Sequence, residues 1–267
     1  MRLGIIGTGK MGSALATGLS KGAAVNASNM LLHDSSASKA RSLARSIGAN
    51  AVSTANATAK NSDIIILAVK PDAIADVLGG IRDSLNNKLL VSIAAAVPLR
   101  FLESHTPRSC RVAAAMPSIP MQVRKGMCYY CLGRRATRKD AALLQKLFSS
   151  VGTAIEVKSE KHLDTAIITG SGNAFIYLVM DAMAKAGERA GLSRRASLQL
   201  AANAAESAGA MARESGLEPE ALMKLVATKK GITEMGLRML KQARVPHAFT
   251  SATLACIRKA QGKRRKW

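Results

Sequence analysis

The chain contains few aromatic residues, and this limits how its core is built and what it binds. Phe, Trp and Tyr together make up 3% of its 267 residues, whereas hydrophobic residues of all kinds make up 48%. Aliphatic side chains must therefore fill the interior. So few rings also offer little stacking surface, which argues against a binder of single-stranded nucleic acid.

The chain also has few acidic residues. The chain has 17 Asp and Glu residues against 39 Lys and Arg residues, which gives a formal net charge of +22. Such an excess raises the hypothesis of a nucleic-acid partner. The basic residues are, however, spread over both halves of the chain, and the only basic run is Lys263–Lys266. We expect a generally basic surface that attracts anionic substrates, and we keep nucleic-acid binding as the weaker alternative.

Long hydrophobic runs are also missing. No uninterrupted apolar segment reaches the roughly 18–20 residues that span a bilayer. The N-terminus predicts a strand that runs directly into the fold, which is not the pattern of a signal peptide. We therefore expect a cytoplasmic protein without membrane contact.

Cysteine is scarce too, with four residues in the chain. Cys128 and Cys131 have the spacing of a redox or zinc motif. The segment 126–132 predicts a strand, however, in which side chains three residues apart point to opposite faces. No second cysteine pair follows, and the four histidines are scattered along the sequence. We expect buried, apolar thiols and no metal site.

The most informative segment lies at the N-terminus. An apolar strand over residues 3–6 leads into a G-x-G-x-x-G pattern, and an Ala- and Leu-rich helix over 13–19 follows. This strand–turn–helix context is the one that a dinucleotide-binding fingerprint requires. The glycines permit the tight turn and the approach of a pyrophosphate, which the helix N-terminus attracts. The alternative is a glycine-rich turn that binds no nucleotide. The predicted cofactor contacts of this loop are Gly7, Gly9, Lys10, Met11 and Gly12.

The first half of the chain alternates between strands and helices. Short apolar segments typical of buried parallel strands are separated by helical patterns, which predicts a doubly wound parallel sheet with right-handed crossovers. We interpret residues 1–157 as an α/β Rossmann domain. Beyond the first strand, the predicted strands are 30–33, 51–53, 64–69, 88–93, 110–114 and 126–132.

The second half reads as helices only. Ala, Met, Leu, Glu and Lys dominate it, and these are strong helix formers. Residues 158–267 therefore predict an all-α domain that carries the basic tail. The segment 174–190 is apolar around much of its circumference, so we expect a second subunit to cover it in at least a dimer. The predicted helices are 162–190, interrupted or kinked at Gly170–Gly172, then 194–215, 218–227, 233–243 and 248–261.

Three further loops follow predicted strands at their carboxyl ends, where open α/β sheets bind ligands. Small side chains after the strand at 88–93 would let a flat nicotinamide ring approach the backbone. Together with the glycine turn, these loops form one coherent rim. The predicted cofactor contacts on it are Ala68, Val69, Lys70, Pro71, Ala94, Met116 and Pro117.

Taken in order along the chain, these segments resemble the pyrroline-5-carboxylate reductase family. The resemblance implies a Rossmann domain, a helical dimerisation domain and the NAD(P)H-dependent reduction of 1-pyrroline-5-carboxylate to L-proline, the last step of proline biosynthesis. The similar segments are 4–18, 68–71, 92–99, 111–120, 126–127, 169–175, 186–192 and 226–233.

The resemblance also implies roles for individual residues. Thr233 would hydrogen-bond the ring nitrogen of the imine, and Ser171 would add a contact; both are the predicted catalytic residues. The alternative for Thr233 is a helix N-cap. Asn56 matches an adenosine contact of the family, with a polar turn as its alternative. The predicted substrate-binding residues are Lys230, Gly231, Ile232 and Thr233.

The chain departs from the family pattern at several positions. Asn173 and Phe175 replace a proline and a tyrosine, Ser118-Ile119 stands where Asn-Thr is usual, and Lys230 replaces a glycine of the substrate loop. These departures leave open a related reductase that acts on a different cyclic imine or keto acid. A nucleotide- or nucleic-acid-binding protein without turnover is the third alternative.

The expected cofactor is NADPH, with NADH as the alternative. Asp34 lies at the end of the second predicted strand, where an acidic residue binds a ribose 2′-hydroxyl and favours NAD. The family often has an arginine after this position, and here Ser35 follows. The hydroxyls of Ser35 and its neighbours, with Lys39 or Arg41, would hold a 2′-phosphate instead.

Overall fold

The computed structural model describes residues 1–264 and consists of two compact units. The first contains residues 1–170 together with the C-terminal residues from 257 on, and the second contains residues 171–256. We describe each by itself. The domain boundary predicted after residue 157 lies just before the helix that starts at Glu160, and it stays a prediction.

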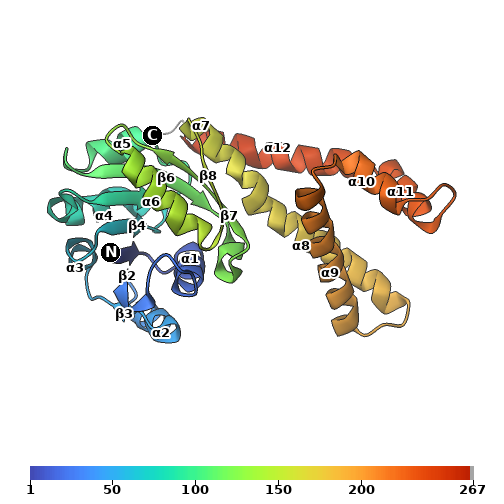
Figure 1. The fold of residues 1–267 in the computed structure, drawn as a ribbon, viewed down its shortest axis with the longest axis horizontal. Coiled ribbons are helices and arrows are strands. Elements are labelled where there is room, and N and C mark those ends of the chain that lie inside the picture. Colours follow the sequence, from blue (N-terminus) through green and yellow to red (C-terminus); the bar gives the residue numbers. More distant parts are fainter. Residues whose placement is uncertain (265–267) are drawn as a thin grey trace. The chain divides into compact units, whose positions relative to one another are not determined.

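The first unit is built on one eight-stranded sheet, and Figure 1 shows helices on both sides of it. The strands lie in the order β3-β2-β1-β4-β5-β6-β7-β8, and each neighbouring pair is parallel except β6 and β7. Their bounds are β1 Leu3–Ile6, β2 Met30–His33, β3 Asn50–Ala51, β4 Ile64–Leu67, β5 Leu89–Ser92, β6 Arg111–Pro117, β7 Gly126–Leu132 and β8 Gly152–Glu156.

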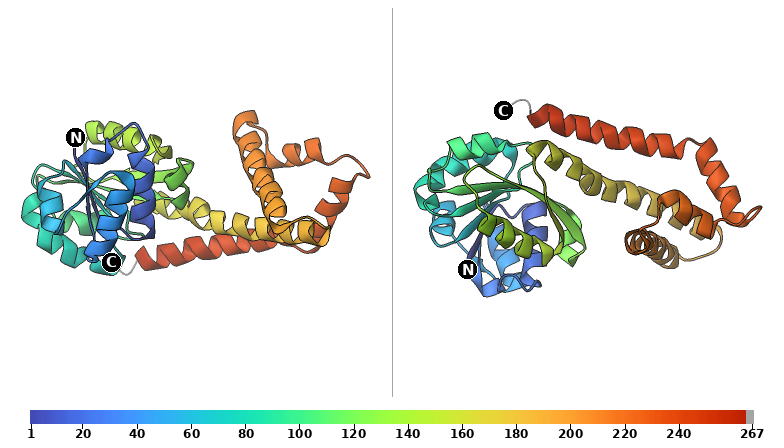
Figure 2. Two further views of the ribbon diagram at one scale, coloured as in Figure 1. Left: turned by 90° about the horizontal axis from the view of Figure 1, so that it is seen from below. Right: turned by 45° about the horizontal axis from the view of Figure 1, so that its top comes forward.

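Both faces of the sheet are buried, which explains why its central strands are apolar without interruption. Along β4, Ile64 and Ile66 join one core cluster, and Ile65 and Leu67 join the other. Helices α1, α2 and α6 contribute to the first cluster, and α3, α4, α5 and α7 to the second. Figure 2 shows helices on both faces of the sheet. Their bounds are α1 Lys10–Ser20, α2 Ala37–Ile47, α3 Ala55–Lys60, α4 Ile74–Ile81, α5 Leu99–Ser104, α6 Arg138–Ser149 and α7 Glu160–Leu163.

The predicted doubly wound α/β fold is confirmed, with three differences in the sheet. β7 runs antiparallel to β6, because the connection over residues 118–125 is too short for the crossover that a parallel neighbour needs. β8 was not predicted, because its mostly exposed residues lack the apolar run of a buried strand. β6 also continues to Pro117, whereas we predicted its end at residue 114. Pro117 is tolerated there because β5 pairs with β6 only as far as Ala114.

The predicted separation of Cys128 and Cys131 is confirmed. Both lie in β7 and are buried, but Cys128 belongs to one core cluster and Cys131 to the other, so the two thiols lie on opposite faces of the sheet. Burial raises the pKa of each thiol. Thiolate chemistry that uses the pair together is therefore disfavoured.

The second unit is helical, as predicted. It contains α8 Ile167–Arg189 from residue 171 on, then α9 Arg194–Ser215, α10 Pro219–Val226, α11 Ile232–Gln242 and α12 Val245–Arg264 as far as residue 256. Gly216 ends α9 in a left-handed conformation, at the predicted position. The interruption predicted at Gly170–Gly172 is wrong, because α8 passes through these residues unbroken. The irregular turn lies earlier, at Asp164–Ala166. Each glycine inside a helix costs about 1 kcal/mol, which a long helix tolerates.

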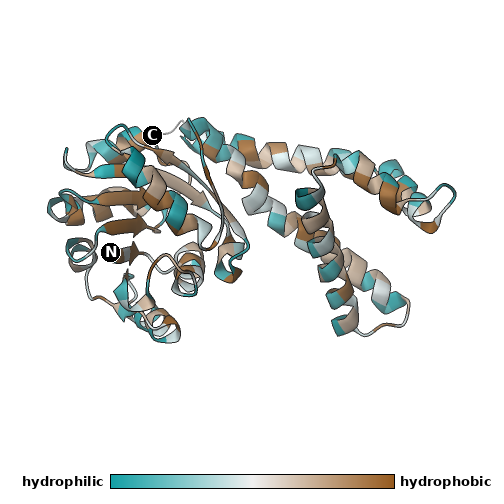
Figure 3. Cartoon of the chain, viewed as in Figure 1, coloured by the Kyte–Doolittle hydropathy of each residue, from teal (hydrophilic) through white to brown (hydrophobic). Residues whose placement is uncertain are grey.

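The helices of the second unit carry large apolar side chains that are exposed in the part of the chain that the structure describes. In α8, Ile176, Tyr177, Leu178 and Met183 are 45%, 59%, 68% and 47% exposed. Figure 3 shows such apolar positions along α8. Among the described residues, the stretch Glu160–Arg189 is long and apolar enough to cross a membrane by length and composition, although these criteria alone are weak. A surface this apolar in a water-soluble setting requires a partner.

At the N-terminus of α6, a buried carboxylate stabilises the first unit through hydrogen bonds and an ion pair. Asp140 is buried at 4% exposure, it completes a capping box with Thr137, and its Oδ1 accepts a hydrogen bond from Arg111 Nε at 2.9 Å. Burial alone raises the pKa of Asp140, but the hydrogen bonds from Thr137 and Arg111 outweigh it and bring the pKa below its ordinary value of 3.8.

We predict that Asp140→Asn lowers the free energy of unfolding by about 2 kcal/mol at pH 7. Because the pKa is lower in the folded state, the carboxylate stabilises the fold above pH 3.8 and loses this effect as the pH falls below it. Urea unfolding should therefore show a larger difference between variant and wild type at pH 7 than at pH 3. Asp83→Asn, at an exposed site, is the control. Equal destabilisation at both pH values would contradict the electrostatic explanation.

Candidate functional site

The turn between β1 and α1 is held by two close backbone contacts. Gly7 has a φ of +101°, and a Cβ on it would lie 2.7 Å from the carbonyl oxygen of Ala68. A Cβ on Gly12 would lie 2.1 Å from the carbonyl oxygen of Gly7. Neither position accepts a side chain without movement of the backbone. The turn is thereby pressed against the end of β4.

Gly9 is different, because a Cβ there would meet no described atom within 4 Å. Gly9 is the N-cap of α1, no side chain within the described chain caps it, and the first turn of α1 contains no acidic residue. Like those of any α-helix, the first backbone N–H groups of α1 have no partner within the helix itself. A phosphate group fits these donors and the positive end of the helix dipole.

Asp34 ties this loop to the end of β2. Its Oδ2 accepts hydrogen bonds from the Thr8 amide at 2.7 Å and the Thr8 hydroxyl at 3.0 Å, and its Oδ1 accepts one from the Ser36 amide at 2.9 Å. Burial by itself raises the pKa of Asp34, but these hydrogen bonds and the charge of Lys39 outweigh it and lower the pKa. The carboxylate is thus ionised and committed to the backbone on both oxygens.

A cavity of about 590 Å³ opens beside this loop, at the carboxyl ends of β1, β2 and β4. The position agrees with the rule that open α/β sheets bind ligands where the strand order reverses. Seven of the predicted cofactor residues line it, namely Gly7, Gly9, Asp34, Ser35, Ala68, Val69 and Lys70.

The prediction missed other residues of the same wall. His33, Ala55, Asp72, Ala73, Asp76 and Val77 also line the cavity. His33 immediately precedes Asp34, so the end of the predicted strand could have identified it. The other residues lie at or near the starts of helices that follow a loop. The sequence pattern does not predict which face of such a helical turn lines a cavity.

The remaining predicted cofactor residues lie elsewhere in the first unit. Asn56 is exposed in α3, and its Oδ1 accepts a hydrogen bond from the Ser84 hydroxyl at 2.7 Å. Ala94 follows β5, and Met116 and Pro117 lie within β6. Lys10, Met11 and Gly12 form the first turn of α1, and Pro71 opens the one-turn helix after β4. Their roles stay predictions.

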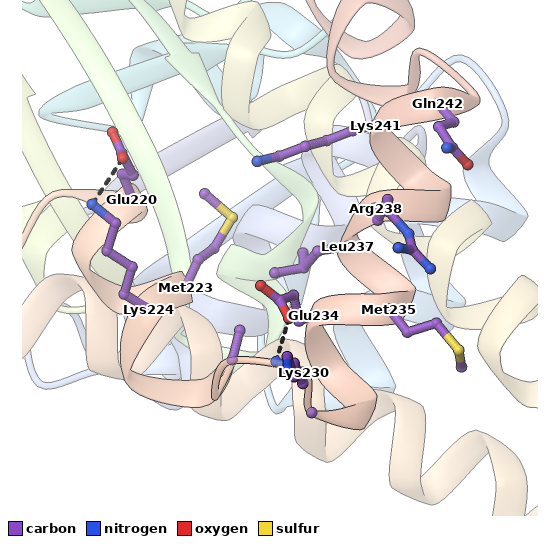
Figure 4. Close-up of a pocket in the computed structure, with 12 residues that line it drawn as sticks. Glu220, Met223, Lys224, Lys230, Glu234, Met235, Leu237, Arg238, Lys241 and Gln242 are labelled. Atoms are coloured by element: carbon purple, nitrogen blue, oxygen red, sulfur yellow. Dashed lines mark hydrogen bonds and ion pairs between the residues drawn. The ribbon is translucent and has the colours of Figure 1, made fainter.

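The second unit has its own pocket, of about 790 Å³, between α10 and α11 (Figure 4). Two of the predicted substrate residues, Lys230 and Gly231, line it. Glu234 points back from α11 and accepts a hydrogen bond from the Lys230 amide, as the dashed line shows. Lys230 has a φ of +60°, so it keeps the left-handed backbone that favours the glycine usual in the family. Arg238 and Lys241 add positive charge to the wall.

The other predicted residues of this loop are exposed at the start of α11. The N-cap of α11 is Gly231, so the alternative in which Thr233 caps the helix is wrong. Ile232 is 88% exposed, and Thr233 follows it on the surface. Ser171 is half-buried within α8. The Thr233 hydroxyl is thus open to a ligand from outside the chain.

Comparison with known proteins decides the family. Residues 160–263 match the family described as pyrroline-5-carboxylate reductase dimerisation, and residues 2–96 match the coenzyme F420-dependent NADP oxidoreductase family. The pyrroline-5-carboxylate reductase of Methanosarcina acetivorans is 36% identical over 255 residues, which are 95% of this chain and 94% of that protein. The chain belongs to the pyrroline-5-carboxylate reductase family.

Other relatives agree over nearly the full length. The pyrroline-5-carboxylate reductase of Pisum sativum is 32% identical over 97% of this chain and 94% of its own. The crystal structure of Plasmodium falciparum pyrroline carboxylate reductase, solved with NADP bound, superposes with a TM-score of 0.90 at 29% identity, over 99% of this chain and 98% of that one. The family and the Rossmann fold predicted from the N-terminal motif and the later segments are both confirmed.

The geometry at Gly9 leads to a sharp test of the cofactor loop. We expect Gly9→Val to fold normally, because the new side chain enters open space, and to weaken NADPH binding at least a hundredfold, because it occupies the place of the pyrophosphate. Fluorescence titration of NADPH measures the affinity, and thermal melting monitors the fold. Gly79→Val, at an exposed glycine of α4 with equally open surroundings, is the matched control. Unchanged NADPH affinity in Gly9→Val would remove this loop from the site.

Proposed function

We propose that this chain reduces 1-pyrroline-5-carboxylate to L-proline with NADPH, the last step of proline biosynthesis. The observation that carries the proposal is the cavity at the carboxyl ends of β1, β2 and β4, open at Gly9, in a chain 36% identical to a pyrroline-5-carboxylate reductase along almost all of its length. The nicotinamide supplies the hydride when it is bound, and the protein supplies position and electrostatics.

The residues at Gly9 fit the diphosphate of such a cofactor. The free N–H groups at the start of α1 would hold its oxygens, and Ala68 and Val69 at the end of β4 would line the adjoining wall. Ala94, at the end of β5, would meet the nicotinamide ring, because its small side chain leaves the ring room.

NADPH is favoured over NADH by the way in which Asp34 is used. Both carboxylate oxygens accept hydrogen bonds from the loop and the α2 N-terminus, which reduces their availability for a ribose 2′-hydroxyl. The hydroxyls of Ser36 and Ser38, 3.0 Å apart, and Lys39 stand at the same helix end, where a 2′-phosphate would be attracted. The relative from Plasmodium falciparum binds NADP.

The substrate end of the reaction would come from the helical unit. The backbone around Gly231 and Ile232 would hold the carboxylate of the cyclic imine, and the Thr233 hydroxyl would hydrogen-bond its ring nitrogen. A protonated imine is already a good electrophile, so a strong general acid is not required for hydride transfer. Lys230, in its left-handed conformation, adds a side chain beside this loop and narrows the space there. It is the residue that would select a different cyclic imine or keto acid as the substrate.

A homodimer would cover the apolar face of α8. The family matched by residues 160–263 is a dimerisation family, and the exposed residues of α8 lie within that range. This occupant explains the apolar stretch without a membrane and agrees with a cytoplasmic enzyme. The generally basic surface would serve to attract anionic cofactor and substrate. In the basic run Lys263–Lys266, residues 265 and 266 lie outside the described residues.

The proposed activity is tested by following NADPH oxidation with pyrroline-5-carboxylate and a panel of other cyclic imines and keto acids, with NADH in parallel. We expect Thr233→Ala to lower kcat/KM for the imine about tenfold, as loss of one hydrogen bond to a charged group predicts, and to change the Kd for NADPH less than twofold. Thr233→Ser keeps the hydroxyl and should retain most activity. Turnover of another panel member but not of pyrroline-5-carboxylate would overturn the assigned substrate.

The proposed dimer is tested at Leu178, which is 68% exposed within the chain. Leu178→Glu should leave each protomer folded and shift the mass measured by light scattering from dimer to monomer, because a charge would be buried in an apolar interface. Arg82→Glu, on the surface of the first unit, is the control. A wild-type protein that is monomeric at micromolar concentration would refute this interface.

A further inference from the structure

The end of α12 lies beside α7 (Figure 1). There Arg264 forms an ion-pair cluster with Glu160 of α7 and Asp164 of the turn that follows it. Arg264 donates to both oxygens of Asp164, with Nη2 to Oδ1 at 2.8 Å and Nε to Oδ2 at 3.1 Å, and its Nη1 lies 3.4 Å from Glu160 Oε1. The Asp164 side chain is 2% exposed and that of Arg264 is 14% exposed. All three residues belong to the first unit. The C-terminal end of the chain thus neutralises a buried carboxylate.

Glu160 has a second partner, at the start of α5. Its Oε1 accepts a hydrogen bond from the backbone N–H of Leu99 at 2.5 Å. Leu99 is the first residue of α5, and its N-cap, Pro98, makes no side-chain cap hydrogen bond. Glu160 of α7 therefore caps the start of α5, by accepting a hydrogen bond that an N-cap side chain normally accepts.

The turn that Glu160 holds is a strained one. Residues 93–98 connect β5 to α5, and within this turn Ala96 has a φ of +65° although it is not glycine. Ala96 is also 2% exposed. A left-handed alanine costs roughly 1 kcal/mol, so it persists only where the flanking structure fixes it. The hydrogen bond from Leu99 to Glu160 fixes the side of the turn that leads into α5.

We propose that Glu160 is a positioning residue for hydride transfer, and that Arg264 orients it. Glu160 holds the turn at Ala94–Pro98 in the conformation that presents Ala94 to the nicotinamide ring, and Arg264 keeps the Glu160 carboxylate aimed at Leu99. This inference rests on the proposed function, which assigns Ala94 to the nicotinamide. Hydride transfer is sensitive to small misplacement, whereas cofactor affinity comes mainly from the phosphate groups bound at the other end of the cofactor.

The first experiment separates position from affinity. Glu160→Ala removes the acceptor and should lower kcat with NADPH and pyrroline-5-carboxylate about tenfold, while the Kd for NADPH stays within twofold. Glu160→Gln keeps an oxygen that accepts the Leu99 N–H and should retain at least half of kcat. Hydrogen–deuterium exchange should show faster exchange of peptides that cover 94–102 in Glu160→Ala only. A kcat within twofold of wild type, or an equal loss of affinity and kcat, would overturn the proposal.

Arg264 is tested in a form that keeps the fold. Arg264→Gln alone leaves Asp164 as an unpaired buried charge and is expected to destabilise the first unit. The double variant Asp164→Asn with Arg264→Gln removes both charges and should fold, with kcat lowered about threefold, because an unoriented Glu160 holds the turn only part of the time. In a Glu160→Ala background the same pair of changes should cause no further loss of kcat.

The control for Arg264 is Arg258→Gln, an exposed residue of the same helix with no ion pair recorded to another described residue. It should change neither kcat nor exchange at 94–102. If the losses of kcat were additive when Glu160→Ala is combined with Asp164→Asn and Arg264→Gln, Arg264 would act independently of Glu160. That result would refute the proposal that Arg264 acts by orienting Glu160. A wild-type protein that turned over no pyrroline-5-carboxylate would refute the proposed function instead, and the exchange measurement would still decide whether Glu160 holds the turn.

Discussion

The close approach of the β1–α1 turn to the end of β4 is the constraint on which the rest of the candidate site depends. Gly12 packs against the carbonyl of Gly7, and Gly7 packs against that of Ala68, so three segments meet without room for a side chain. This packing fixes the start of α1, so that Gly7 and Gly9 line the cavity at the carboxyl ends of β1, β2 and β4. Asp34 completes the arrangement from β2 by holding Thr8 on both its amide and its hydroxyl.

The two units solve the problem of burial in different ways. In the first, a sheet covered on both faces buries its own apolar residues, so each strand is complete within one chain. In the second, the helices lack enough partners, and side chains as large as Tyr177 and Leu178 remain exposed. A helix cannot bury an all-round apolar surface against two or three neighbours, which is why the family description of this region as a dimerisation segment agrees with its surface.

The departure from the family pattern at Lys230 changes the side chain of a turn but not its backbone conformation. Lys230 keeps the left-handed backbone of the glycine it replaces, so the turn between α10 and α11 retains its path and acquires a cationic side chain. The amide of Lys230 is occupied by Glu234, and Lys230 and Glu234 both line the pocket between α10 and α11. Lys230 therefore brings a side chain to a turn where the family usually has a glycine.

The sequence by itself determined the elements whose signal is local. The glycine spacing after residues 3–6, the apolar runs such as Ile64–Leu67 and the helix that ends at Gly216 are each fixed by a few neighbouring residues, and the structure has them where predicted. Seven of the cofactor residues predicted from strand ends do line one cavity, because the carboxyl ends of parallel strands must meet at one edge.

Only the tertiary structure decided what depends on residues far apart in the chain. The direction of β7, the existence of β8 and the extension of β6 to Pro117 follow from which strand lies beside which. The same holds for the commitment of Asp34 to Thr8 and for the reach of Glu160 and Arg264 toward Leu99, which join residues 26 to 104 positions apart. Local propensity carries no information about such contacts, because their free energy arises only when the folded backbone brings the partners together.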